Sequence, residues 1–140
     1  MENQNINEED IFLILSKGQD WQIIKLIREG ITKNALLRLG NAIGFTMKEL
    51  ASILDLSVRV LQRYSDDTKL SKVASEKAIA LANLYQHGED VFGKMEIFNR
   101  WMKTPHFMFK QRCPMDVLDT YCGIQMVHAE LGRIEHGIFA

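Results

Sequence analysis

The sequence has few of the features that mark secreted or membrane proteins. Its 140 residues include only two cysteines, Cys113 and Cys122, which are too few for a disulfide scaffold and lack a second pair at metal-ligand spacing. No apolar run approaches the roughly 18 residues that span a bilayer. The first ten residues carry four acids and no cation. We therefore expect reduced thiols, no membrane span, no signal peptide and a cytoplasmic protein.

A net charge is also nearly absent. Seventeen basic and 18 acidic residues give −1, which offers no support for binding nucleic acid through an overall excess of Lys and Arg. The distribution is uneven, because residues 94–112 hold five bases against one acid, whereas residues 1–32 and 113–140 are each acidic. With 46% hydrophobic residues, the chain has the composition of a globular domain. Alternating charged faces indicate more than one partner.

Motifs that carry enzyme chemistry are missing. The four histidines form no i,i+4 metal pair with a third ligand, and none lies beside a Ser or Cys in a nucleophile motif. The glycines of the segment 40–44 lack the preceding strand and the Lys-Ser/Thr end of a phosphate loop. We expect a non-enzyme with no catalytic residue, no metal and no cofactor. Each histidine is interpreted as a surface or helix-end residue, and they are His87, His106, His128 and His136.

The hydrophobic pattern lacks sustained alternation with period two. Apolar residues recur every three or four positions, which predicts an all-α protein. The expected helices run from Asn7 to Gly18, Asp20 to Gly30, Thr32 to Gly44, Thr46 to Leu54, Ser57 to Tyr64, Ser71 to Gly93, around Ile97 to Met102, and Thr120 to Gly137. The polar link 65–68 divides an N-terminal helical bundle, residues 1–68, from a small helical domain, residues 69–140.

Two short neighbouring helices predict a helix-turn-helix over residues 46–64. Thr46 and Glu49 form a capping box that starts the first helix, and Ser57 is a good N-cap for the second. About three residues separate them, with Asp55 at the turn position where Gly is usual. Asp tolerates the left-handed backbone conformation better than most residues. This layout is typical of a helix-turn-helix.

The second of these helices has a polar face suited to DNA. Leu61, with Val58 or Val60, is expected to face the core, whereas Arg59, Gln62 and Arg63 fall on the opposite side. Arg pairs bidentately with guanine and Gln with adenine in the major groove. A helical hairpin with a solvated cationic face is the alternative. The candidate DNA-binding residues are Thr46, Ser57, Val58, Arg59, Gln62 and Arg63.

Aromatic and methionine residues concentrate in the second domain. Aromatic side chains dominate core burial, so we expect a core built from Trp101, Met102, Phe107, Met108 and Phe109, with Trp101 as its anchor. The chain ends on the apolar residues Ile138 and Phe139, followed by Ala140. Apolar residues at a chain end either fold back on the core or serve a partner.

Several short motifs follow one another along the whole chain. In the second half they are 91–93, 100–105, 114–120, Gly123 and 131–139, and in the first half 28–31, 49–51, 54–57 and 59–63. Together they resemble the antitoxins of the Xre type, also called ParS or MbcA type, which are partners of RES-domain toxins. The resemblance covers roughly residues 27–140. Segment 109–113 departs from the family, where a Gly-rich turn is common.

The resemblance implies a bacterial antitoxin that neutralises a toxin acting on NAD and represses its own operon through the helix-turn-helix. In this family the C-terminal segment approaches the toxin's active-site cleft. The candidate toxin-binding residues are therefore Arg133, Glu135, Gly137, Ile138, Phe139 and Ala140. The expected partners are a RES-domain toxin, operator DNA and a second copy in a homodimer. The alternative is a free-standing transcription regulator whose C-terminal domain dimerises.

Overall fold

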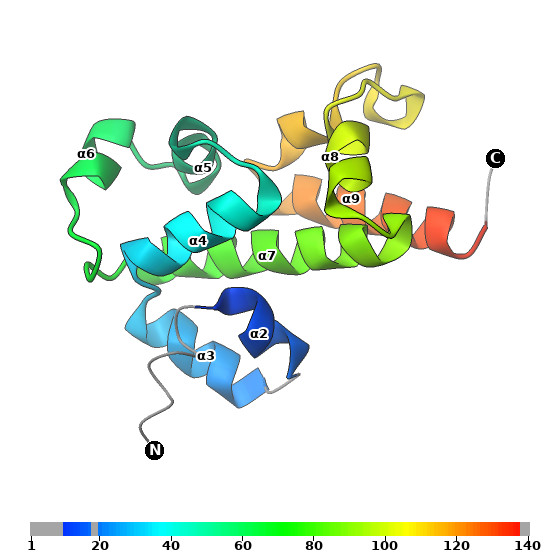
Figure 1. Ribbon diagram of the computed structural model, residues 1–140. Coiled ribbons are helices and arrows are strands. Elements are labelled where there is room, and N and C mark those ends of the chain that lie inside the picture. Colours follow the sequence, from blue (N-terminus) through cyan, green and yellow to red (C-terminus); the bar gives the residue numbers. More distant parts are fainter. Residues whose placement is uncertain (1–9, 18–19, 138–140) are drawn as a thin grey trace. The chain divides into compact units, whose positions relative to one another are not determined.

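The computed structural model describes residues 10–17 and 20–137, and all regular elements in these ranges are helical (Figure 1). The α-helices are α2 (Ile11–Ser16), α3 (Asp20–Glu29), α4 (Lys33–Ile43), α5 (Met47–Leu54), α6 (Val58–Arg63), α7 (Lys72–Phe92), α8 (Met95–Met102) and α9 (Tyr121–Glu135). Two 3-10 helices, η1 (Phe107–Phe109) and η2 (Pro114–Val117), join α8 to α9. The all-α class expected from the sequence is confirmed.

Local capping signals account for most of the helix ends. The hydroxyl groups of Thr32, Ser71 and Thr120 each accept a first-turn backbone N–H, at 2.9–3.1 Å. Gly44 and Gly93 follow α4 and α7 in the left-handed conformation, as helix-ending glycines do. The cap expected at Asn7 lies outside the described residues. The carboxylate of Asp10 accepts the N–H of Leu13 at the start of α2.

The chain divides into two compact units within α7, between Ala82 and Asn83. The sequence predicts the boundary at the polar link 65–68, but this link is hydrogen-bonded to the first unit. The N–H of Lys33 donates to the carbonyl of Thr68 at 2.9 Å, and the N–H of Leu70 donates to the carbonyl of Ile31 at 2.8 Å. The buried hydroxyl of Ser75 accepts the N–H of Ile31 at 3.0 Å. These bonds join the first turn of α7 to the segment that precedes α4.

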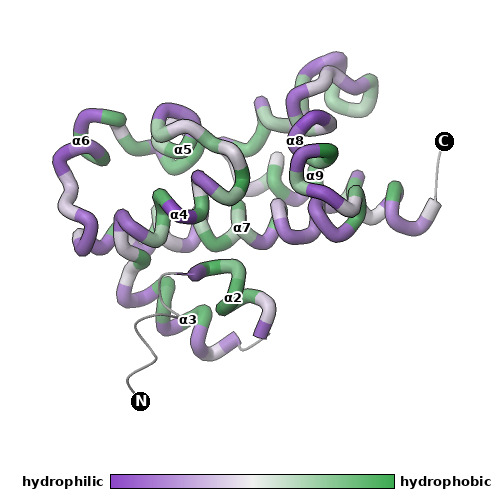
Figure 2. The backbone as a smooth tube through the Cα atoms, in the orientation of Figure 1, coloured by the Kyte–Doolittle hydropathy of each residue, from purple (hydrophilic) through white to green (hydrophobic). Residues whose placement is uncertain are grey.

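The core of unit 1, residues 1–82, is built from the apolar stripes of its helices. The alternation of hydrophobic and hydrophilic residues along these helices is visible in Figure 2. Leu36, Leu39 and Ile43 form the buried stripe of α4, at the three- and four-residue spacing that the sequence shows. The other buried residues of this core include Ile31, Leu50, Ala51, Leu54, Leu61, Leu70, Ala74 and Ala78.

Phe98 is the central core residue of unit 2, residues 83–140. Its side chain is fully buried, and its ring lies at a centroid distance of 5.0 Å from Tyr85 in an edge-on arrangement. A Cβ at Gly88 would overlap three atoms of this ring, so the glycine inside α7 allows the close approach. Trp101, which we expected to be the anchor, is only half-buried and covers the outside of the cluster, 6.0 Å from Phe98. That prediction was wrong, because α8 turns Phe98 and Met102 inward.

Candidate functional site

The α5–turn–α6 segment has the local geometry of a helix-turn-helix. The hydroxyl of Thr46 accepts the N–H of Glu49 at 3.1 Å, and the carboxylate of Glu49 accepts the N–H of Thr46 at 2.9 Å. Asp55 adopts the left-handed conformation, with φ of 59°. The hydroxyl of Ser57 accepts the N–H of Val60 at 2.9 Å and begins α6. The capping box, the left-handed turn and the second N-cap all lie where the sequence predicts them.

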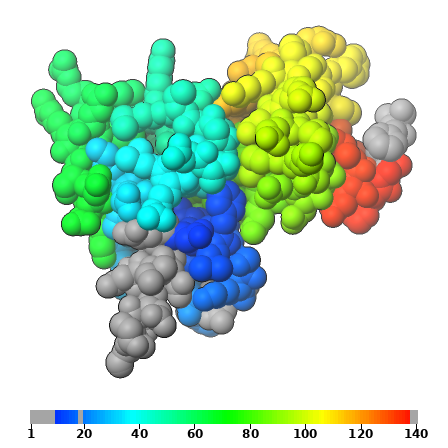
Figure 3. Space-filling model, in the orientation of Figure 1, coloured from blue at the N-terminus to red at the C-terminus, as the bar shows by residue number. Residues whose placement is uncertain are grey.

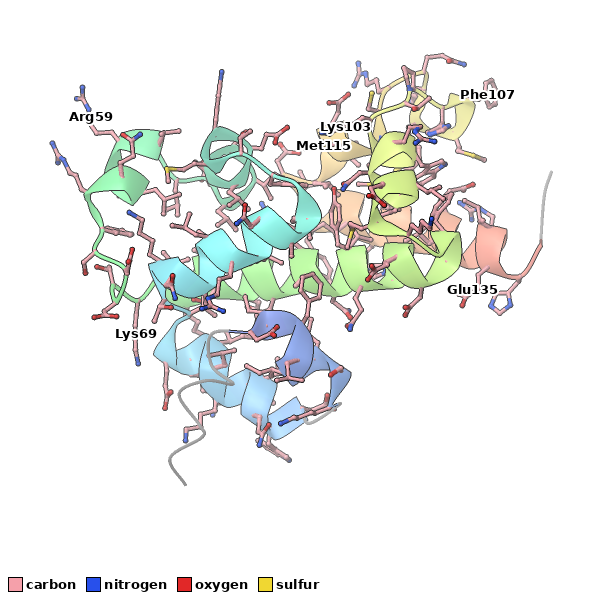
Figure 4. All side chains as sticks on the ribbon, viewed as in Figure 1. Arg59, Lys69, Lys103, Phe107, Met115 and Glu135 are labelled. Atoms are coloured by element: carbon pink, nitrogen blue, oxygen red, sulfur yellow. The ribbon has the colours of Figure 1, made fainter. Side chains whose placement is uncertain are left out.

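Helix α6 presents a polar face to solvent. Leu61 is fully buried beneath the helix, whereas Arg59, Gln62 and Arg63 are exposed. Figure 3 shows side chains of the α5–α6 region standing out from the surface, and Figure 4 shows Arg59 extending away from α6. Of the two valines that could have joined Leu61 in the core, Val58 is half-buried and Val60 is 38% exposed. An exposed Arg–Gln–Arg face on a short helix matches the chemistry of base readout.

A buried lysine fixes the end of α6. The Nζ atom of Lys33, on the first turn of α4, donates to the carbonyl oxygen of Tyr64 at 2.8 Å, and the Lys33 side chain is almost fully buried. The N–H of Asn34 donates to the carbonyl of Asp66 at 3.0 Å. Carbonyls at a helix C-terminus lack intrahelical partners and attract cations. Lys33 therefore holds the exposed helix on the bundle, and no sequence motif had identified it.

The loop between α8 and η2 displays a large aromatic residue beside cations. Phe107 is 84% exposed, and Figure 4 shows it at the edge of the loop. Met108 is also exposed, so two of the five residues expected in the core lie at the surface. The reason is geometric, since η1 has only three residues and turns Phe109 alone inward. Three exposed bases lie in the loop, Lys103, Lys110 and Arg112, and two more, Lys94 and Arg100, lie at the start of α8 and within it.

The same loop is closed by two consecutive residues with positive φ. Lys110 and Gln111 have φ of 55° and 64°, a conformation that favours glycine. They stand in the segment where the resembling family commonly has a Gly-rich turn. The N–H of Gln111 donates to the carbonyl of His106 at 2.9 Å, and the N–H of His106 donates to that of Arg112 at 3.2 Å. These backbone hydrogen bonds hold the chain in a turn at this position although the turn contains no glycine.

The last turns of α9 are held by side-chain contacts. Arg133 donates to the carboxylate of Glu130 through Nη2 at 2.7 Å and through Nε at 2.9 Å. The carboxylate of Glu135 lies 3.3 Å from Nε2 of His87 on α7; Figure 4 shows Glu135 near the end of α9. Gly137 follows with φ of 69°. Ile138, Phe139 and Ala140, the remaining candidate toxin-binding residues, lie outside the described residues.

His87 and His128 form a pair that sequence reasoning missed. Their rings are stacked with centroids 5.2 Å apart, and their Nδ1 atoms are 2.9 Å from each other. Burial, followed by the neighbouring charge of His87, lowers the pKa of His128 below its ordinary value of 6.5. The two residues are 41 positions apart, so no local spacing could have indicated their contact.

No cluster of three or more metal-ligating side chains occurs among the described residues. The described helices also include none that is long and apolar enough to cross a membrane.

Two family models match consecutive segments of the chain. The Antitoxin Xre-like helix-turn-helix domain matches residues 22–83, and the Antitoxin Xre/MbcA/ParS C-terminal toxin-binding domain matches residues 87–137. The junction between the two matches falls next to the division of the compact units at residues 82 and 83. Each family domain therefore corresponds closely to one compact unit.

Two curated antitoxins are similar over most of their length. The Prs ADP-ribosylating antitoxin of Sphingobium sp. (strain YBL2) is 28% identical over 127 residues, 84% of this chain and 80% of its own. Antitoxin Xre of Photorhabdus laumondii subsp. laumondii is 27% identical over 115 residues, 81% of this chain and 78% of its own.

A chain in the crystal structure of the M. tuberculosis MbcT–MbcA toxin–antitoxin complex shares the fold. Its TM-score is 0.57 at 24% identity, and the match covers 75% of this chain and 94% of that one. At this identity the likeness establishes the fold alone. The function class rests on the two family domains and on the two curated antitoxins. The chain belongs to the Xre/MbcA/ParS antitoxin family and is the antitoxin of a toxin–antitoxin system, with a helix-turn-helix domain followed by a toxin-binding domain.

Proposed function

We propose that this antitoxin represses its own operon by inserting α6 into the major groove of operator DNA. The observation that carries this proposal is the exposed face of Arg59, Gln62 and Arg63 on a helix fixed by Ser57 at one end and Lys33 at the other. A homodimer would place two such helices about 34 Å apart, one turn of DNA, on a palindromic site. Val58 and Thr46, at the starts of α6 and α5, complete the proposed contact region with Ser57.

Replacing the two arginines separately tests the DNA proposal. Arg59→Ala and Arg63→Ala should each weaken binding to the DNA upstream of the gene by about 1–3 kcal/mol if they read bases. A gel-shift titration at several salt concentrations measures this loss, and a phosphate contact would appear instead as a uniform loss with a smaller salt slope. Lys25→Ala, at an exposed position of α3, is the control. Wild-type binding by both arginine variants would exclude α6 as the recognition helix.

We further propose that the toxin partner is a RES-domain protein that acts on NAD, and that residues 133–140 enter or border its nucleotide cleft. The motif 131–139 supports the partner class, and so does the relative named for ADP-ribosylation, a reaction that consumes NAD. Arg133 and Glu135, already fixed by Glu130 and His87, would set the direction from which this segment approaches.

Co-expression with the adjacent toxin gene tests this second proposal. Deleting residues 137–140 removes little of the helical core, so operator binding should survive while protection from the toxin is lost. Cell growth, the NAD level and a pull-down measure protection and complex formation. A second variant, Phe107→Ser with Lys110→Glu, tests the exposed loop instead. Protection by the truncated chain together with loss of protection in the loop variant would place inhibition on the basic face of residues 94–112.

The neighbouring gene distinguishes the main alternative. A free-standing regulator would have no adjacent RES-type reading frame, and deletion of residues 137–140 would then change only its own assembly or DNA binding. An adjacent RES-type gene whose product is captured by the full chain would favour the antitoxin with this partner class.

A further inference from the structure

The contact between His87, His128 and Glu135 joins the last turn of α9 to α7 inside the toxin-binding unit. Both imidazoles are partly buried, and their Nδ1 atoms are within hydrogen-bond distance at 2.9 Å. The other ring nitrogen of His87 faces the carboxylate of Glu135 at 3.3 Å. Glu135 is the final residue of α9, two positions before Gly137. The three side chains therefore form one chain of contacts that ends at the proposed toxin-binding segment.

The distances determine where the protons lie. A carboxylate only accepts hydrogen bonds, so Nε2 of His87 carries a proton. In neutral His87 the Nδ1 atom is then an acceptor, and Nδ1 of His128 must be the donor. If His87 gains a proton, its charge pairs with Glu135, and His128 keeps the bond by moving its own proton to Nε2. Protonation of both rings leaves two N–H groups facing each other, and the bond is lost.

The surroundings make the second protonation unfavourable. His128 lies in the interface between the helices, where burial disfavours its charged form, and a cationic His87 adds repulsion. On α9, Glu130 and Arg133 pair with each other. The remaining charged groups of the neighbouring turns are exposed, and they are Glu89 and Asp90 on α7, Glu96 and Arg100 on α8, and His136 after α9.

We propose that His87 and His128 are positioning residues for the toxin-binding end of α9, linked to it through Glu135, and that acidification, by placing a positive charge on both facing rings, breaks the contact of α9 with α7 at His128 and weakens toxin binding. The proposal rests on the proposed role of residues 133–140. The contact is intact near neutral pH. Because burial lowers the pKa of His128 below its ordinary value of 6.5, the second protonation, and with it the loss of the contact, comes below that pH. Because the folded chain binds fewer protons than the unfolded chain in this range, its stability falls together with the pH.

Histidine NMR on the full chain tests the proton arrangement without any toxin. At neutral pH we expect an Nδ1–H tautomer for His128, an Nε2–H tautomer for His87 and a through-bond coupling between their facing nitrogens. On acidification, the pKa of His128 should lie below its ordinary value. Nε2–H tautomers on both rings with no coupling between them would overturn the proposal, whether or not the chain binds a toxin.

A variant that cannot titrate separates positioning from simple packing. His128→Asn places an amide near the Nδ1 position, so it should keep folding and toxin binding near neutral pH but lose the pH dependence. In the wild type, the equilibrium constant for unfolding should rise as the pH is lowered from 7.5. Each unit by which folding lowers the pKa of His128 corresponds to a rise of about tenfold. His136→Asn, at an exposed histidine, is the control and should follow the wild-type profile.

Affinity for the co-purified toxin, measured across the same pH range, completes the test. We expect the wild type and His136→Asn to bind several-fold more weakly below pH 6, and His128→Asn to stay constant. Equal pH dependence in all three proteins would refute the positioning role. If no toxin is bound at any pH while the NMR and unfolding results hold, the proposed function fails and the proton-dependent contact stands.

Discussion

Replacing Gly88 by alanine tests the packing of the toxin-binding unit, because two effects of known size oppose each other there. In a helix interior, Ala is favoured over Gly by about 1 kcal/mol. At this position, however, a Cβ would overlap three atoms of the Phe98 ring. Overpacking of a well-filled core costs about 1–3 kcal/mol. The sign of the net effect depends on whether Phe98 can move away.

The neighbours of Phe98 leave its ring little freedom. Its side chain is fully buried, and the rings of Tyr85, Phe92 and Trp101 surround it at centroid distances of 5.0, 5.8 and 6.0 Å. A shift of Phe98 would therefore displace other aromatic rings. We expect the steric cost to exceed the helix propensity gain, so that Gly88→Ala lowers the free energy of unfolding by up to about 2 kcal/mol.

Gly132 is the matched control, since it is also a helical glycine of unit 2 and a Cβ there would meet no atom within 4 Å. Gly132→Ala should raise the free energy of unfolding by about 0.5–1 kcal/mol. Urea denaturation followed by tryptophan fluorescence measures both, in a Trp21→Phe background so that Trp101 reports on unit 2. A Gly88→Ala chain as stable as the Gly132→Ala chain would refute the argument.

Two further predictions concern burial and backbone conformation. Phe98→Ala should destabilise by about 3–5 kcal/mol, whereas Trp101→Ala, at a half-buried position, should cost about 1–2 kcal/mol; the same urea titration compares them, and equal losses would contradict the assigned core. Asp55→Gly should stabilise the chain by about 1 kcal/mol, because it removes the left-handed strain of a non-glycine residue. Operator binding in a gel shift should remain unchanged, and a loss of binding would show that the Asp55 side chain contacts DNA.

Local signals made the helix-turn-helix predictable from the sequence. The capping box of Thr46 and Glu49, the N-cap at Ser57 and the left-handed Asp55 each depend on residues three or four positions apart. In each of these interactions the two partners lie close together in the sequence, so both can be identified within one short segment. The exposed side of α6 then follows from the buried position of Leu61.

Burial in the loop after α8 could not be predicted in the same way. Phe107, Met108 and Phe109 are equally apolar, and composition alone assigns them all to the core. Which one faces inward depends on a 3-10 turn of three residues and on the positive φ of Lys110. Neither feature has a local signature, because Lys110 stands where glycine would be expected.

The side chains that orient the two proposed binding elements come from distant parts of the chain. Lys33 binds the carbonyl that ends α6 from 31 positions away, and His87 faces Glu135 from 48 positions away. In each case a residue on an earlier helix contacts a polar group at the end of a later one, the backbone carbonyl of Tyr64 for Lys33 and the side-chain carboxylate of Glu135 for His87. Capping therefore determines where each binding element begins and ends, whereas contacts between helices determine how it is held. A substitution at Lys33 should therefore weaken DNA binding, and a substitution at His87 should weaken toxin binding, although neither residue is proposed to contact the partner.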